Sequence, residues 1–245
     1  MNNFVNEVHQ TLIPRRDDKH GPLPPMLVAM TIVTGLVDAF SYLLLGHVFV
    51  ANMTGNVVLL GFALVGAHGF SVTASISAIA AFGVGAVVGG IVGSRFDHRR
   101  DRLLSYSSAL QVVLISVSVV FATLSGAQVG TWYRYGLITV LAIAMGIQNA
   151  AARKLAVPDL TTTVLTLTIT GIAADSAIAG GTGSKSGRRL ISAAAMLAGA
   201  VVGATFVVHS HIYFPLVIAL GVIAVISVSS RVSGSSDAPW VGSSS

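Results

Sequence analysis

Eight long apolar stretches constrain the fold of this chain more than any other feature of its sequence. A helix needs about 20 apolar residues to cross the hydrocarbon core of a bilayer, and each stretch has or nearly has that length. Only 9% of the 245 residues are charged, against roughly 25% in soluble domains. The sequence therefore predicts an all-α, polytopic transmembrane helix bundle. The stretches run over about 26–45, 48–66, 72–93, 103–125, 134–151, 160–180, 190–208 and 211–229.

The positions of Lys and Arg indicate how many stretches cross, because cytoplasmic loops carry an excess of these residues. If all eight crossed from a cytoplasmic N-terminus, six of the fourteen basic residues would lie outside. If 48–66 and 160–180 instead enter and leave on one side, only Arg134 lies outside. We therefore expect about six spans plus two re-entrant or broken segments. We also expect the N-terminus in the cytoplasm and the chain in the inner (plasma) membrane.

The chain also resembles itself, at an offset that grows from 111 to 114 residues. Three spans would precede the second copy, so the second copy would lie upside down in the membrane. This predicts a pseudo-symmetric inverted repeat, the architecture of transporters with broken helices, with units at about 26–93 and 134–208. The matching segments are TGLVDAFSYL (34–43) with MGIQNAAARK (145–154), MTGNVV (53–58) with LTLTIT (165–170), and AAFGVGAVVGG (80–90) with AAMLAGAVVGA (194–204).

Polar side chains gather at a few places in these apolar stretches. Asp38 is the only acid near the middle of a predicted span, where a carboxylate costs about 2.5–3.5 kcal/mol on insertion scales. It can hold a proton or a cation in a pathway, or it can anchor a neighbouring helix end, and the sequence leaves both open. The candidate residues for a substrate or ion pathway are Asp38, Asn52, Thr54, Gly55, Asn56, Gln148, Asn149, Thr166 and Thr168.

The cluster from Asn52 to Asn56 fits a segment that turns inside the membrane. Gly55 permits backbone shapes that other residues resist, and Asn and Thr side chains can satisfy freed backbone groups or contact a solute. The alternative is that these groups hydrogen-bond neighbouring helices. The threonines at 161–163, Thr166, Thr168 and Thr170 would form the mirror patch. For them, pore lining and helix packing are equally open.

The segment TGLVDAFSYLLLGHVFVANMTGNVVLLG, followed later by GIQNAAARK and a Thr-rich segment, resembles the YoaK-like family of bacterial membrane proteins. That family is known by a domain-of-unknown-function label. The resemblance covers about residues 26–229 and implies a polytopic inner-membrane protein with about six spans. It carries over no activity. One departure is Leu167, where the resemblance leads us to expect a glycine in a Thr-Gly-Thr-Leu-Thr pattern.

Several function classes lack support in the sequence. There is no cysteine, the histidines are scattered, and no Ser/His/Asp arrangement, paired carboxylates or phosphate loop occurs. We therefore expect no enzymatic activity, no metal and no cofactor. The net charge of +5 comes from basic residues beside apolar stretches, which anchor a membrane protein rather than bind nucleic acid.

The sequence divides into three regions and leads to one principal hypothesis about function. Residues 1–25 are a polar cytoplasmic segment, residues 26–229 are the transmembrane domain, and residues 230–245 are a disordered tail. The chain is predicted to be a small-solute transporter or channel with a polar site at the midplane. The alternative is a non-transporting sensor or scaffold that works through its basic loop at Arg95–Arg102. Expected partners are the lipid bilayer, a small polar solute or proton, and a second copy bound through the Gly-rich helix faces.

Overall fold

The computed structural model describes residues 2–13, 18–126, 129–158, 160, 165–175, 179–180, 186–234 and 240–242. Within these ranges the chain contains helices and no strand, which confirms the predicted all-α fold. The helices are α1 (Asn2–Leu12), α2 (Leu23–Leu44), α3 (Met53–Leu64), α4 (Val72–Arg95), α5 (Arg100–Ser125), α6 (Thr131–Leu155), α7 (Leu165–Ala174), α8 (Ser186–Val208) and α9 (Phe214–Val232).

Six of these helices, α2, α4, α5, α6, α8 and α9, are long and apolar enough to cross a membrane. The shortest of them has 19 residues, or about 28 Å at 1.5 Å per residue, close to the thickness of the hydrocarbon core. The apolar helices α3 and α7 have only 12 and 10 residues. These two helices are too short to cross. The prediction of about six spans plus two broken segments is confirmed.

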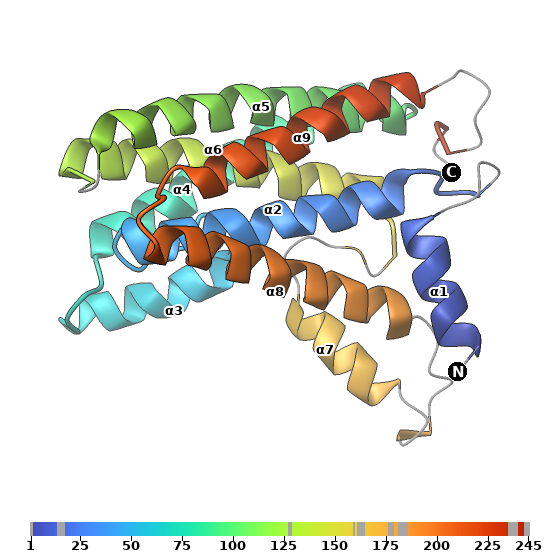
Figure 1. The fold of residues 1–245 in the computed structure, drawn as a ribbon, viewed down its shortest axis with the longest axis horizontal. Coiled ribbons are helices and arrows are strands. Elements are labelled where there is room, and N and C mark those ends of the chain that lie inside the picture. The colour runs from blue at the N-terminus through green and yellow to red at the C-terminus, as the bar shows by residue number, and fades with distance from the viewer. Residues whose placement is uncertain are drawn as a thin grey trace.

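Figure 1 shows where the two short helices lie among the long ones, which run roughly parallel. We call the end of the bundle that carries α1 the α1 end, and the opposite end the far end. α2 runs to the far end, and α3 begins partway along the bundle and returns to the far end, where α4 begins. α7 begins beside α8 and runs to the α1 end, where α8 begins. The preceding long helix and the short helix therefore finish at the same end of the bundle, which is the far end for α2 and α3 and the α1 end for α6 and α7.

Two helix pairs, α4 with α6 and α2 with α8, make the most extensive contacts in the bundle, and glycines permit their close approach. A Cβ at Gly85 would collide with the backbone of α6, and one at Gly146 would collide with the backbone of α4. In the other pair, a Cβ at Gly35 would collide with the α8 backbone and one at Gly199 with the α2 backbone. These are small-residue contacts of the kind that lets membrane helices pack tightly.

The same contacts correct the expectation that Gly-rich faces bind a second copy. Gly85, Gly89 and Gly93 all face α6 of their own chain, where an added Cβ would meet Ile143, Ala150 or the stem of Lys154. These faces are therefore already covered inside one molecule. They are not available to a partner.

Both terminal regions contain ordered structure. Residues 2–12 form α1, and α2 begins slightly earlier than expected, with Pro24 and Pro25 in its first turn, where proline has no helical N–H bond to lose. In the tail, Trp240 and Val241 are buried. The amide of Arg100 donates to the Val241 carbonyl at 3.0 Å. The described part of the tail is thus packed against the α1 end rather than disordered.

Basic side chains are distributed unequally between the two ends. Arg134, in the first turn of α6, is at the far end. The other described Lys and Arg residues are at the α1 end, on its turns or on the adjoining turns of the long helices. Arg15, Arg16 and Lys185, which the charge argument also used, lie outside the described residues. The remaining basic residues keep the one-sided pattern on which the six-span prediction was based.

Candidate functional site

Asp38 anchors the extended segment that leads into α3. Its Oδ1 accepts hydrogen bonds from the backbone amides of Val50 at 3.0 Å and Ala51 at 2.8 Å. The residue is buried, and its Oδ2 has no hydrogen-bond partner among the described residues. Two backbone groups that leave regular structure at membrane depth are therefore satisfied by one carboxylate, as a bilayer interior requires.

Asn56 and Asn52 complete the anchoring of this segment. Asn56, on the first turn of α3, accepts from the Phe49 amide at 2.9 Å through Oδ1 and donates to the Phe49 carbonyl at 2.6 Å through Nδ2. Asn52 is the N-cap of α3, and its Oδ1 accepts from the Gly55 amide at 3.1 Å. The carboxamides thus replace backbone partners where the chain turns. The side chains of these two asparagines therefore bond to the backbone of their own segment rather than to neighbouring helices.

Gly55 has a steric reason for lacking a side chain. A Cβ there would lie 2.9 Å from the ring of Phe49, and that ring stacks on Tyr42 with centroids 4.8 Å apart. The start of α3 can therefore lie directly against the extended segment. Thr54, its neighbour, is exposed and has no hydrogen bond from its side chain to the described residues.

Gln148 and Asn149 lie next to each other on α6 but have different surroundings. Gln148 is fully buried, and its Nε2 donates to the Met30 carbonyl at 3.2 Å and to Thr34 Oγ1 at 2.9 Å. These bonds join α6 to α2 at the centre of the bundle. Asn149 is half-buried and donates to the Met145 carbonyl at 3.0 Å. Gln148 is thus a packing contact, whereas Asn149 faces open space.

That open space is a cavity of about 1230 Å³ between α3, α4, α6, α7 and α8, which we call the central cavity. It brings together five of the predicted site residues, from the starts of α3 and α7 and from α6. It does not include Asp38, Asn56, Gln148 or Thr168 in its lining. The five are Asn52, Thr54, Gly55, Asn149 and Thr166. The threonines at 161–163 lie outside the described residues.

Two cationic residues also line the central cavity. Their sequence positions indicated only that they anchor the chain at the membrane surface. Arg153 and Lys154 end α6 on the α1 side, and Arg153 follows Asn149 by four residues, on the same helical face. That spacing is the signal that could have placed Arg153 at the cavity. Lys154 forms an ion pair with Asp97 at 2.6 Å, and the Lys154 ammonium lowers the pKa of the Asp97 carboxyl.

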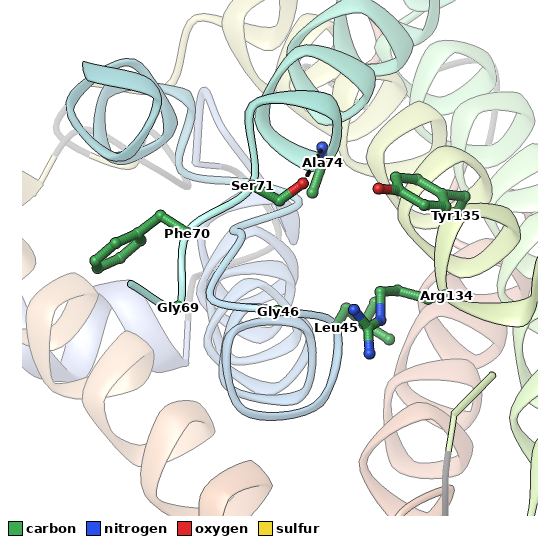
Figure 2. A pocket seen from close by; sticks show the side chains of 8 residues that line it. All are labelled: Leu45, Gly46, Gly69, Phe70, Ser71, Ala74, Arg134 and Tyr135. Atoms are coloured by element: carbon green, nitrogen blue, oxygen red, sulfur yellow. Dashed lines mark hydrogen bonds between the residues drawn. The ribbon is translucent and has the colours of Figure 1, made fainter. Parts of the chain in front are cut away.

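A smaller cavity of about 270 Å³ lies at the far end, between the end of α2 and the starts of α4 and α6. Figure 2 shows Arg134 beside Leu45 and Gly46, and the Tyr135 hydroxyl pointing toward the start of α4. Ser71 caps α4 there by accepting from the Ala74 amide at 3.2 Å. Arg134 Nε is buried without a hydrogen-bond partner among the described residues. No predicted site residue lines this cavity.

A metal centre has no counterpart in the part of the chain that the structure describes. No three His, Asp or Glu side chains come together there. The central cavity therefore offers hydrogen bonds and positive charge rather than a ligand set for a metal. The expectations of no metal and no cofactor stay predictions.

Comparison with known proteins adds a family. The family model described as "Protein of unknown function (DUF1275)" matches residues 26–229. The UPF0700 transmembrane protein YoaK of Bacillus subtilis (strain 168) is 34% identical over 157 residues. That match covers 61% of this chain and 65% of the relative, so the chain spans less than two thirds of the curated relative's length. No solved structure matches the chain.

Proposed function

The chain belongs to the DUF1275 family of membrane proteins, and because that family has no established activity we propose a function from the site itself. We propose that the protein is a transporter or channel for a small solute, with the central cavity as part of the pathway. The observation that supports this most is the cavity of about 1230 Å³ into which both short helices present the polar residues of their first turns.

The size and lining of the cavity favour passage of a solute over simple packing. Small-molecule sites typically occupy about 300–1,000 Å³ and carry a few convergent polar groups. Here Asn52, Thr54, Asn149 and Thr166 supply such groups at the wall of one cavity. Helices that begin partway through the membrane at a binding site are a recurring feature of secondary transporters.

We further propose that the two halves of the bundle form an inverted repeat. Gly35 and Gly146, at matching places in the two sequence units, each meet the backbone of a helix from the other unit. Gly85 and Gly199 do the same from the partner helices. The contacts support one crossing geometry used twice. The two short helices, which end at opposite ends of the bundle, fit the same relation.

We propose that the α1 end faces the cytoplasm and that the protein lies in the inner (plasma) membrane. Cytoplasmic loops are enriched in Lys and Arg, and among the described residues only Arg134 is at the far end. On this orientation the polar mouth of the central cavity, with Arg153 and Lys154, opens toward the cytoplasm. The N-terminus is then cytoplasmic as well.

The proposal is tested by blocking the cavity in reconstituted vesicles. The chain has no native cysteine, so Thr54→Cys places one thiol in the cavity and Ala67→Cys places one on the far-end turn. We expect uptake of the transported solute to be lost when a bulky thiol reagent is attached at position 54 and kept when it is attached at position 67. A screen should cover nitrate, formate, chloride, urea, glycerol and potassium, each against protein-free vesicles. Absence of flux for every solute would instead favour the sensor or scaffold.

A further inference from the structure

We infer that the central cavity is built for a small monovalent anion from the aqueous phase, such as nitrate, chloride or formate. This inference rests on the proposed function for its role in transport. It makes a separate claim about the charge of the ligand. Three features of the described residues carry it: the charges of the lining, its free hydrogen-bond donors, and the position of Asp38.

The charged residues of the lining are all positive. Arg153 and Lys154 line the cavity, and no Asp or Glu does among the residues that the structure describes. Lys154 is neutralised in part by Asp97, at 2.6 Å. Arg153 is exposed and makes no ion pair within the described ranges. A cleft that is lined by charges of one sign and has walls of low dielectric constant raises the local concentration of ions of the opposite sign.

The start of α3 supplies hydrogen-bond donors to the same cavity. The Oδ1 of Asn52 accepts a hydrogen bond from the Gly55 amide. The side-chain NH₂ of Asn52 is then the group that can donate to a ligand. The backbone amides of Met53 and Thr54, the first two of the helix, have no hydrogen-bond acceptor in the described part of the chain. Unpaired amides inside a membrane are costly, and an anion near a helix N-terminus satisfies both them and the helix dipole.

The position of Asp38 argues against a cation. A cation in this cavity would need a carboxylate or a set of free acceptor oxygens. The only acid near the middle of α2 is turned to the extended segment, where Oδ1 is occupied by Val50 and Ala51. It does not line the cavity. The carboxyl group holds the backbone in place, and no acid of the described ranges stands in the lining.

The test measures the charge preference of the cavity without requiring transport. Thr54→Cys is labelled in nonionic detergent, so that no lipid headgroup supplies the charge, with an anionic and a cationic methanethiosulfonate reagent of similar size. Rates are normalised to Ala67→Cys. We expect the anionic reagent to be favoured by roughly threefold or more, and 50 mM nitrate or formate to slow labelling at position 54 more than gluconate does at equal ionic strength. Repeating the rates in zwitterionic vesicles extends the result to a bilayer.

Matched charge removals locate the source of the preference. Arg153→Gln should abolish most of it, because Arg153 lines the cavity. Arg95→Gln removes one charge at the same end of the bundle from a residue outside the lining and should leave the preference unchanged. Equal rates, a faster cationic reagent, or no labelling at position 54 would each overturn the anion assignment. Charge-selective labelling without solute flux would retain the anion site and reject transport, whereas flux of urea or potassium alone would retain transport and reject the anion.

Discussion

The two halves of the bundle, α2–α4 and α6–α8, are alike in their helix contacts and unlike in their polar anchors. In both halves a glycine of the first helix and a glycine of the last one meet the backbone of a helix from the other half. The residue three positions after the first glycine is Asp38 in one half and Asn149 in the other. Asp38 is buried against backbone amides, whereas Asn149 lines the central cavity. Glycines thus permit the same close helix crossing in both halves. The polar residues differ, since one anchors the backbone and the other lines the cavity.

The largest effect is expected from enlarging the crossing glycines. Gly85→Leu and Gly199→Leu each place a side chain into the backbone of a facing helix, and overpacking of this kind costs about 1–3 kcal/mol or more. We expect both variants to lose monodisperse protein and thermal stability to a similar degree. Gly83→Leu, at a glycine with open space around it, is the control. Very different losses at positions 85 and 199 would show that the two crossings are not equivalent.

The second effect separates the two anchors. Asp38→Ala leaves the amides of Val50 and Ala51 without their acceptor, at a cost of about 1–3 kcal/mol for each buried unsatisfied group. Asn149→Ala removes a half-buried side chain from the cavity wall and should cost only about 1 kcal/mol. Thermal unfolding in the same detergent compares the two variants. Equal destabilisation would contradict the assignment of Asp38 as the structural anchor of the pair.

The third effect separates anchoring from lining within α3. Asn56→Ala removes both hydrogen bonds to Phe49 and should lower stability by about 1–3 kcal/mol. Thr54→Ala makes a change of similar size at an exposed residue of the cavity and should stay within about 0.5 kcal/mol, while solute flux falls. An Asn56→Ala protein as stable as the parent would contradict the role of this carboxamide in holding the extended segment against α3.

The smallest effect is a pH dependence at the α1 end, outside both halves, where His20 lies between α1 and α2. Burial lowers the pKa of His20 below its ordinary value of 6.5, and repulsion from Arg100 and Arg188 lowers it further. The folded protein therefore resists protonation that the unfolded chain accepts, so stability falls as pH drops from 6.5 through the lowered pKa. We expect the melting temperature to decrease between pH 7.5 and pH 5.5, and His20→Gln to reduce that decrease. An unchanged slope in the variant would assign the effect to other groups.

Much of this architecture was predictable from the sequence because the bilayer imposes strong rules. The charge imbalance around Arg134 and the polar residues of 48–66 together indicated that this stretch does not cross, and α3, with 12 residues, is too short for a span. The packed Trp240 was not predictable, since its Gly/Ser-rich surroundings indicate disorder. Neither was the separation of Asp38 from the central cavity. A carboxylate that binds backbone amides and one that lines a pathway have the same sequence signal, and only the path of residues 48–52 distinguishes them.

The sides of the membrane reached by the turns that flank the two short segments test the central claim most directly. Single cysteines at Ala67, Ala156 and Ala179, in a chain with no other thiol, are labelled in cells and in inverted vesicles with a membrane-impermeant reagent. Two returning segments predict that position 67 reacts from the side opposite the N-terminus and that positions 156 and 179 both react from the same side as the N-terminus. Position 67 on the side of the N-terminus would mean that the first short segment crosses, and positions 156 and 179 on opposite sides would mean that the second one does; either result would contradict the predicted six spans.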